Sequence, residues 1–130
     1  MTTEEKVKYW IELSNYDMET SKVMFKTKRY LYVAFMCHQT IEKIFKAYFS
    51  KLMEETPPYT HKLTYLAQHG GFYDLLSEEQ QNFVTELEPL NIETRYPEYK
   101  KRLMKRLSPY YCEMLVKKTK TLQKWIKEQL

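Results

Sequence analysis

The segment from about Tyr30 to Leu52 carries apolar side chains around most of its circumference when it is drawn as an α-helix. A helix of this kind is usually enclosed by other helices or by a second subunit, because no face of it is well solvated. One narrow polar stripe interrupts the pattern at helical spacing. It consists of Gln39, Glu42, Lys43 and Lys46. The sequence therefore predicts a buried central helix whose polar stripe needs partners.

Two further long helices are expected, one before and one after this central helix. Thr2 and Glu5 have the spacing of a capping box, and a helical apolar pattern follows them to about residue 27. The apolar face of this first helix also carries Asp17, so we expect a polar group to meet it. Ser108 and Pro109 are typical of an N-cap followed by proline at the first helical position, and they open the last helix.

Shorter elements are expected between the central and the last helix. Residues 61–69 show a short helical pattern that Gly70-Gly71 stops, residues 77–89 show another, and residues 91–107 are expected to be irregular. The chain has only these two glycines and no series of hairpin turns, which disfavours a many-stranded β-fold. We expect a single all-α domain over residues 1–130, a four- to five-helix up-and-down bundle.

The composition also excludes several settings and several kinds of site. The first residues lack the basic-then-apolar order of a secretory signal, and no stretch approaches the roughly 18 apolar residues of a membrane span. We therefore expect a cytoplasmic protein that does not associate with a membrane. Cys37 and Cys112 form no metal-binding or redox spacing and are expected to be core thiols. There is no Gly-rich phosphate loop and no nucleophile elbow. We expect neither a metal nor a cofactor.

Charge is distributed unevenly along the chain, although the net charge is only +4. Residues 1–94 hold 10 Lys/Arg and 14 Asp/Glu, whereas residues 95–130 hold 11 and 3. The basic residues of this last part include Lys100, Lys101, Arg102, Lys105, Arg106, Lys117, Lys120, Lys124 and Lys127. Nearby tyrosines that can stack on unpaired bases are Tyr96, Tyr99, Tyr110 and Tyr111. Either this part binds nucleic acid, or its lysines solvate a helix and its tyrosines pack.

Glu42 and Arg95 are the residues of this sequence best suited to a functional site. Glu42 lies on a mostly buried helix and is placed to accept hydrogen bonds from a cation on another segment. Arg95 offers five donors that match a carboxylate or a phosphate. In one interpretation they form a buried ion pair that holds a loop to the bundle. In the other, Glu42 orients Arg95 toward a phosphate in a cleft.

The three histidines are expected to have structural roles before chemical ones. His38 falls on the apolar side of the central helix and is expected to be a hydrogen-bonded core residue. His61 lies at the entry of the short helix 61–69, where a local structural role is favoured over acid/base chemistry. His69 falls in the last turn of that helix, where the helix dipole favours it.

Three segments, in order along the chain, resemble motifs of the HEPN family of small helical domains. Residues 39–47 (QTIEKIFKA) resemble the family's QxxEKxxKA pattern, residues 60–63 (THKL) its TH-x-L pattern, and residues 94–97 (TRYP) its RYP signature. Asp17 matches an acidic position of the family's first helix. The resemblance covers nearly the whole chain, and it implies a helical bundle that forms a homodimer through its long helices.

The resemblance also implies a class of partner proteins, but the sequence departs from one branch of the family. Family members are commonly encoded beside a minimal nucleotidyltransferase, as a toxin and antitoxin or as a two-part enzyme, and many others are metal-independent ribonucleases. The ribonuclease branch has a histidine shortly after its arginine, whereas Arg95 is followed by no histidine. The chain therefore looks closer to the RYP branch, for which nucleotide or nucleic-acid binding is proposed.

Three functions follow, and the sequence leaves open whether the chain is an enzyme. The first is a partner module of a nucleotidyltransferase that binds nucleotide or nucleic-acid phosphate through Arg95, Tyr96, Lys46, Glu42, Lys43 and Gln39. The second is a metal-independent ribonuclease in which Arg95 stabilises phosphate charge and Tyr99 or His61 replaces the missing histidine. The third is a plain nucleic-acid-binding protein that uses the basic C-terminal surface.

Overall fold

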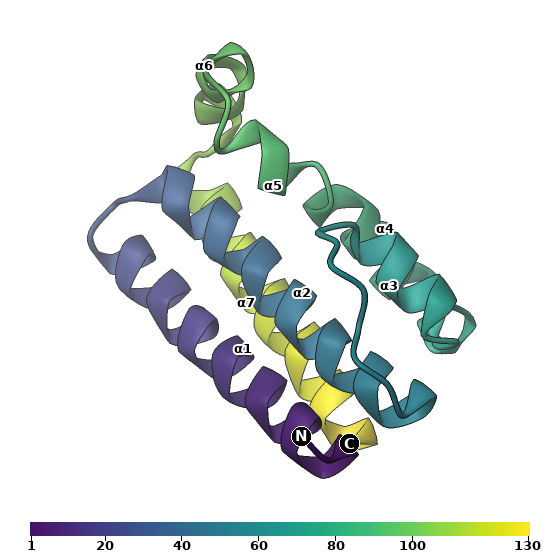
Figure 1. Cartoon of the computed structure of the whole chain (residues 1–130). Coiled ribbons are helices and arrows are strands. Elements are labelled where there is room, and N and C mark those ends of the chain that lie inside the picture. The colour runs from purple at the N-terminus through teal and green to yellow at the C-terminus, as the bar shows by residue number, and fades with distance from the viewer.

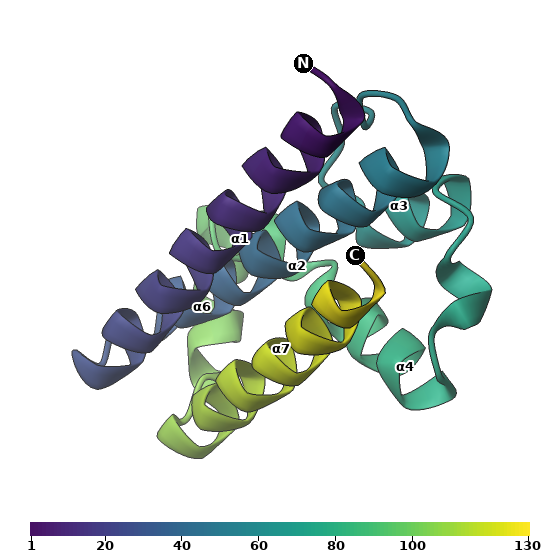
Figure 2. The ribbon, with the colours of Figure 1, turned by 90° about the horizontal axis from the view of Figure 1, so that it is seen from below.

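Three long helices form the main body of the protein in this computed structural model, which describes residues 1–130. They are α1 (Thr3–Lys26), α2 (Tyr30–Met53) and α7 (Pro109–Gln129). Helix α1 runs antiparallel to α2, α7 runs in the same direction as α2, and both termini lie at one end of the bundle (Figure 1). Seen from below, α7 lies on one side of the α1–α2 pair (Figure 2).

Shorter elements connect α2 to α7 and lie along the other edge of α2 (Figure 1). Helix α6 extends away from the long helices at the end opposite the termini. These elements are α3 (Leu63–His69), the 3-10 turn η1 (Tyr73–Leu75), α4 (Glu78–Leu87), α5 (Leu90–Glu93) and α6 (Pro97–Arg106). The prediction of an all-α bundle is confirmed. None of its helices is long and apolar enough to cross a membrane.

Three helices, α1, α4 and α7, begin at the local signals in the sequence. Thr2 and Glu5 form the expected capping box, with each side chain accepting from the other residue's backbone N–H. A second capping box joins Ser77 and Gln80 at the start of α4. The Ser108 hydroxyl caps α7 by accepting from a backbone N–H. Because caps involve neighbours in sequence, these ends could be predicted without knowledge of the tertiary structure.

The core surrounds α2, as the apolar side chains around most of its circumference predict. Phe45 is fully buried, and its ring packs edge-on against Phe72 at a centroid distance of 5.1 Å. Tyr48 stacks on the same Phe72 ring at 4.6 Å. Cys37 and Cys112 are buried free thiols, which confirms the expected core role, and burial raises the pKa of Cys37 to about 12.

The expectation of an irregular stretch over residues 91–107 is wrong, because this stretch contains most of α5 and all of α6. Pro97 stands at the start of α6, after an extended Tyr96, so it initiates a helix rather than preventing one. Leu103 is the only buried residue of α6, and the helix is otherwise mostly polar. A ten-residue helix with one buried side chain offers little apolar periodicity to detect. This stretch also adds to the expected helix count.

Candidate functional site

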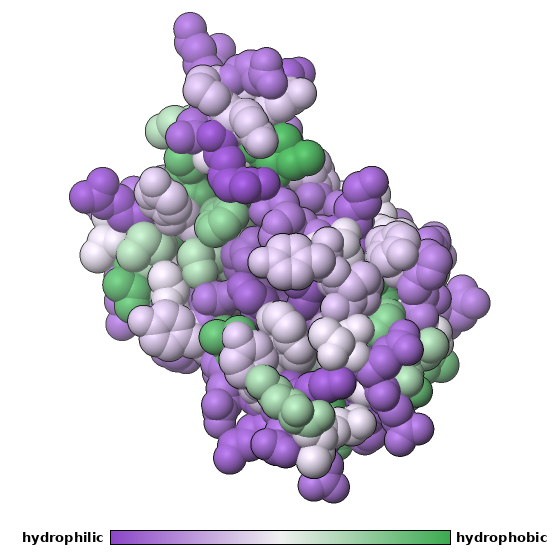
Figure 3. Space-filling model, viewed as in Figure 1, coloured by the Kyte–Doolittle hydropathy of each residue, from purple (hydrophilic) through white to green (hydrophobic).

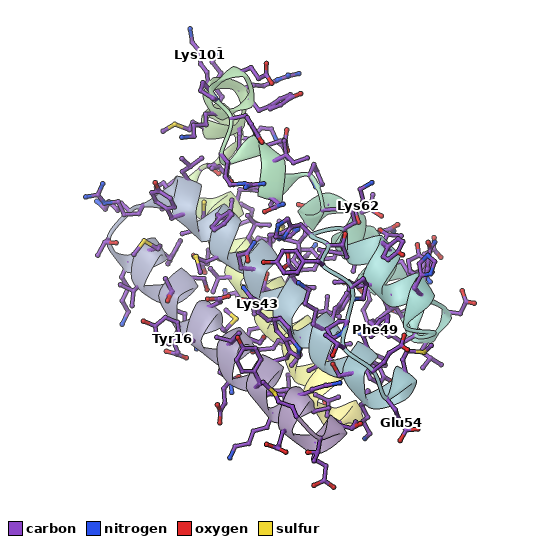
Figure 4. All side chains as sticks on the ribbon, viewed as in Figure 1. Tyr16, Lys43, Phe49, Glu54, Lys62 and Lys101 are labelled. Carbon is purple, nitrogen blue, oxygen red and sulfur yellow. The ribbon has the colours of Figure 1, made fainter.

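The polar stripe of α2 is largely buried against α1 and the 54–62 connection. Gln39, Glu42 and Lys46 are buried, and Lys43 is partly exposed. An unpaired charge in such a place is costly, so the partners of each charged group decide what the stripe can do. Lys43 lies between α1 and α2 in Figure 4. Its amine donates to Asp17 at 2.9 Å and to Gln39 at 2.9 Å, which confirms the expected polar partner for Asp17.

Glu42 is the centre of a buried ionic cluster. Its Oε1 is 2.9 Å from His61 Nδ1, and its Oε2 accepts from Lys46 Nζ at 3.2 Å. The Lys46 amine also lies 5.1 Å from the centre of the Trp10 ring, a cation–π arrangement. The Glu42 side chain is 2% exposed, whereas that of His61 is 51% exposed. The cluster therefore extends from the core to the surface through the His61 imidazole.

The expected contact between Glu42 and Arg95 is wrong in both of its interpretations. Arg95 is exposed, and its Nε donates to the backbone carbonyl of Asn91 at 2.8 Å. Its guanidinium also lies 5.8 Å from the centre of the Tyr96 ring. Because α5 directly precedes Arg95, the side chain folds back on that helix instead of entering the bundle. His61, for which the sequence predicted a local structural role, takes the place at Glu42 that Arg95 was expected to take.

A chain of hydrogen bonds nevertheless connects Arg95 with the α2 stripe. The Gln39 amide donates to Asn91 Oδ1 at 3.5 Å, and the Asn91 carbonyl holds Arg95. Gln39 in turn accepts from Lys43. Asn91 was missed in the sequence, where its signal was the i, i+4 spacing to Arg95, a spacing that has meaning only on a helix. The sequence-predicted residues thus form two groups, one around Glu42 and one around Arg95, with Gln39 between them.

His38 lies beneath the Glu42 cluster and is fully buried. Its Nδ1 is 3.5 Å from the Gln39 amide nitrogen, in keeping with the expected hydrogen-bonded core residue. Burial lowers the pKa of His38 to about 4, and the nearby Glu42 opposes this shift only in part. His38 is therefore neutral at pH 7, and its 3.8 Å approach to Glu42 is not an ion pair there.

The other predicted site residues are spread over the surface of α6 and α7. Tyr99 lies on α6 and makes no side-chain hydrogen bond, and Tyr96 and Tyr110 are exposed. Tyr111 instead donates to Glu86 at 2.6 Å, which assigns it to packing between α7 and α4. The basic residues Lys100, Lys101, Arg102, Lys105 and Arg106 all belong to α6, which extends away from the long helices (Figure 1). All of them are exposed except Lys100, which is partly exposed.

No group of three or more Cys, His, Asp and Glu side chains is arranged to hold a metal ion. The Glu42 cluster contains two histidines and one carboxylate, but Lys46 occupies one oxygen of that carboxylate. Without a metal, Arg95 can donate hydrogen bonds to an anion, and His61 can serve as a proton-transfer group.

Comparisons with known proteins agree with this architecture. The family model of the HEPN domain matches residues 7–129. The crystal structure of TT1696 from Thermus thermophilus superposes with a TM-score of 0.81 at 15% sequence identity, covering 96% of this chain and 98% of that chain. At this identity the likeness concerns the fold alone. No curated protein matches the chain by sequence. The family match over almost the whole chain shows that the protein belongs to the HEPN domain family.

Proposed function

We propose that the protein is a non-catalytic HEPN module that forms a homodimer, partners a minimal nucleotidyltransferase and binds nucleotide or nucleic-acid phosphate at Arg95. The observation that carries the phosphate site is the state of Arg95. Its Nε is held by the Asn91 carbonyl, no carboxylate pairs with it, and its side chain is exposed. A guanidinium fixed at Nε and unpaired at its two terminal nitrogens is suited to bidentate contact with a phosphate.

The surroundings of Arg95 support a nucleotide more than a free inorganic anion. Tyr96 is half-exposed beside the guanidinium, so its ring is available to stack on a base. Helix α6 follows directly and carries five Lys and Arg residues, which raise the local concentration of anions. Gln39 and Asn91 act by positioning Arg95, and Lys43, Glu42 and Lys46 hold the part of α2 on which Gln39 stands.

The nucleotidyltransferase partner and a place in a toxin–antitoxin pair rest on the family membership. HEPN domains commonly occur with such enzymes, and a partner that handles nucleotides is consistent with a phosphate site on this chain. Co-expression of the protein with the nucleotidyltransferase encoded nearest to it tests this part directly. A stable complex on size exclusion supports the pairing, and elution as separate proteins rejects it.

Binding at Arg95 is tested with Arg95→Ala and the matched variant Arg102→Ala. Both substitutions remove one exposed positive charge, but only Arg95 is held by Asn91. We expect adenine and guanine nucleotides to raise the Tm of the parent, because a ligand of the native state stabilises it by mass action. Arg95→Ala is expected to weaken binding by roughly 10-fold or more, the effect of losing a charge-assisted contact. Arg102→Ala is expected to bind almost as the parent does.

Equal loss in the two variants would show diffuse attraction by α6 instead of a site. A parent whose Tm responds to no nucleotide would reject the phosphate site altogether. Isothermal titration calorimetry at two salt concentrations separates these cases, because diffuse binding falls steeply with salt.

A second candidate function, metal-independent RNA cleavage, is favoured by the contact between Glu42 and His61. A buried carboxylate that holds imidazole Nδ1 orients the ring and leaves Nε2 for proton transfer. His61 matches this arrangement, since its Nδ1 is bound to Glu42 and its ring is half-exposed. In such a reaction the 2′-hydroxyl of RNA loses its proton to Nε2 and attacks the adjacent phosphorus. The bond to the 5′ oxygen then breaks and leaves a 2′,3′-cyclic phosphate. The 5′ oxygen takes a proton from a water molecule, whose hydroxide takes the proton held at Nε2.

Labelled single-stranded RNA incubated in EDTA tests this candidate on a denaturing gel. If the parent cleaves, His61→Ala is expected to lower the rate by about 10²–10⁴-fold, the usual contribution of a general base. His69→Ala is the control, since His69 is exposed and stacks on Tyr65 away from Glu42. Intact RNA in every lane would reject cleavage and leave the non-catalytic module standing.

A further inference from the structure

A groove with a volume of about 750 Å³ lies between α4 and α7. Its lining residues fall between Ser77 and Glu86 on the α4 side and between Lys117 and Leu122 on α7. The two helices are joined at one end, where Tyr111 donates to Glu86 at 2.6 Å. In the view from below, both helices lie on the side of α2 that faces away from α1 (Figure 2). None of the lining residues takes part in the two groups of the candidate site, so this α4–α7 groove is a separate feature.

The two walls of the groove carry opposite charge. On the α4 side, Glu78 and Glu79 are exposed and form no ion pair, and Glu86 adds a third carboxylate. On the α7 side stand Lys117 and Lys118, which are also exposed. No ion pair joins the two walls, and the Lys117 amine pairs within α7 instead. The groove therefore keeps negative and positive charge apart, with space between them.

The carboxylates of α4 disfavour nucleic acid as the occupant. A phosphate backbone bound to Lys117 and Lys118 would face Glu78 and Glu79 across the groove, and like charges in such an arrangement repel. Helix α6, whose surface is mostly hydrophilic (Figure 3), carries five Lys and Arg residues against one Glu and suits a polyanion better. The groove needs an occupant with cations along one side and anions along the other.

The apolar floor of the groove is too small to hold a small organic ligand by burial. Phe83 and Leu122 line it, but their side chains are only 5% and 2% exposed. Small-molecule sites bury most of the ligand against apolar side chains, and this floor offers little of that surface. The occupant must gain its affinity from many contacts spread along the groove, as a segment of a protein does.

The backbone of the two walls favours a helical segment over an extended one. Both walls are α-helices, whose N–H and C=O groups are bonded internally, and the capping box of Ser77 and Gln80 occupies the start of α4. An extended peptide would leave its own backbone groups without protein partners, whereas a helix satisfies them by itself. The ten residues of α4 span roughly 15 Å, which is about three turns of a docked helix.

We propose that the α4–α7 groove binds one α-helix of a partner protein. The docked helix presents Lys or Arg to the α4 wall, Asp or Glu to the α7 wall, and an apolar side chain to Phe83 between them. Charges on both sides fix the rotation of this helix about its axis, and they reject partners that carry only one sign of charge. The inference goes beyond the proposed function, because it does not depend on phosphate binding at Arg95.

Two lactam-bridged helical peptides of identical composition test the inference. The segregated peptide carries Lys along one edge, Leu in the centre and Glu along the other edge, whereas the mixed peptide alternates Lys and Glu on both edges. We expect the parent to bind the segregated peptide roughly 10-fold more tightly or better in fluorescence anisotropy, because only this peptide matches both walls. Equal binding of the two peptides overturns the inference. Displacement of the segregated peptide by single-stranded RNA overturns the choice of occupant.

The variant Lys117→Gln/Lys118→Gln neutralises the α7 wall. Its control is Lys120→Gln/Lys124→Gln, which removes two exposed lysines of the same helix that do not line the groove. We expect the first variant to lose the preference for the segregated peptide and the control to keep it, since both have the same net charge. All four positions are exposed, so the Tm of each variant is expected to stay close to that of the parent. A preference that survives in the first variant, or that disappears in both, contradicts binding in the groove.

The α4 wall has its own matched pair of variants. Glu78→Gln/Glu79→Gln is expected to remove the preference, whereas Glu54→Gln/Glu55→Gln, two adjacent exposed glutamates outside the groove, is expected to keep it. Glu78 and Glu79 lie in the first turn of α4, where carboxylates interact favourably with the helix dipole, so a small fall in Tm is expected. Circular dichroism at the binding temperature checks that the variant is folded. The same binding preference in both variants would mean that the α4 carboxylates do not contact the peptide.

Blocking the groove tests its position independently of charge. Asn82 is exposed and lines the groove, whereas Gln68 is an exposed amide on α3 outside it. A bulky maleimide attached to Asn82→Cys is expected to prevent binding of the segregated peptide, and the same label on Gln68→Cys is expected to leave it unchanged. The native Cys37 and Cys112 are buried and are not expected to react. Binding that persists with position 82 labelled, or that is lost equally in both variants, overturns the proposed location.

Discussion

Glu42→Ala is expected to lower the free energy of unfolding by about 3–5 kcal/mol, the usual effect of removing one partner from a buried ion pair. Lys46 is buried and has Glu42 as its only carboxylate partner, so alanine leaves an uncompensated ammonium beside the Trp10 ring. The same change releases His61 and with it the connection between α2 and α3. In a domain of this size we expect Tm to fall by roughly 10–20 °C.

The chain contains a close control for this prediction. Glu113 and Lys117 form an ion pair on α7 with the same i, i+4 spacing and a distance of 2.8 Å, but both side chains are exposed. Glu113→Ala is expected to change the free energy of unfolding by less than about 1 kcal/mol, because water screens an exposed pair. Urea unfolding of the two variants measures the difference. Similar losses of unfolding free energy in the two variants would mean that burial of the Glu42 cluster adds nothing to the effect of the substitution.

Replacing both members of the buried pair separates pairing from burial. Glu42→Leu/Lys46→Met removes both charges at about constant volume and is expected to recover most of the stability that Glu42→Ala loses. His61 still lacks its partner in this variant, so recovery is expected to be incomplete. A double variant less stable than Glu42→Ala would show that the pair itself stabilises the fold beyond satisfying Lys46.

The fold was predictable wherever a local signal or a long apolar period defined an element. The capping boxes at Thr2 and Ser77 and the start at Ser108 involve residues within one turn, and the structure confirms all three. The central position of α2 followed from its apolar girth. Helix α6 was not predicted because its sequence is mostly polar, with one buried residue, and because no side-chain cap precedes Pro97 as Ser108 precedes Pro109.

The sequence indicated most residues of the candidate site, except Asn91, but it did not predict which of them contact one another. The i, i+4 geometry of α2 places Glu42 beside Lys46, and this contact needs only the helix. Whether His61 or Arg95 reaches Glu42 depends on the path of the 54–62 connection and on α5, and neither leaves a periodic signal. The sequence therefore predicted that Glu42 needs a donor from another segment, but it indicated Arg95 where the structure has His61.

The second large expected effect is a loss of folding stability at acidic pH, and it comes from His38. Burial lowers the pKa of His38 from 6.5 to about 4. The charge of Glu42, a hydrogen bond with the His61 backbone and the charge of Glu88 oppose this shift, and the charge of His61 adds to it. In the unfolded chain the imidazole takes up a proton near its ordinary pKa, whereas in the folded protein it stays neutral down to about pH 4. Between these values the unfolded state binds more protons, so stability falls as pH falls. The loss attributable to His38 is expected to reach about 3 kcal/mol at pH 4.

His38→Leu tests this assignment, because leucine removes the titrating ring and places an apolar side chain of comparable size at a fully buried position. Urea unfolding between pH 7 and pH 4 is expected to show a shallower decline in stability for this variant than for the parent, by up to one proton, or about 1.4 kcal/mol per pH unit. His69→Gln removes an exposed histidine and is expected to keep the parent's pH dependence. If His38→Leu declines as steeply as the parent, carboxylates dominate the acid response and the buried imidazole does not contribute to it. A variant that is also more stable at pH 5 than the parent would show that neutral His38 is retained at a cost in stability.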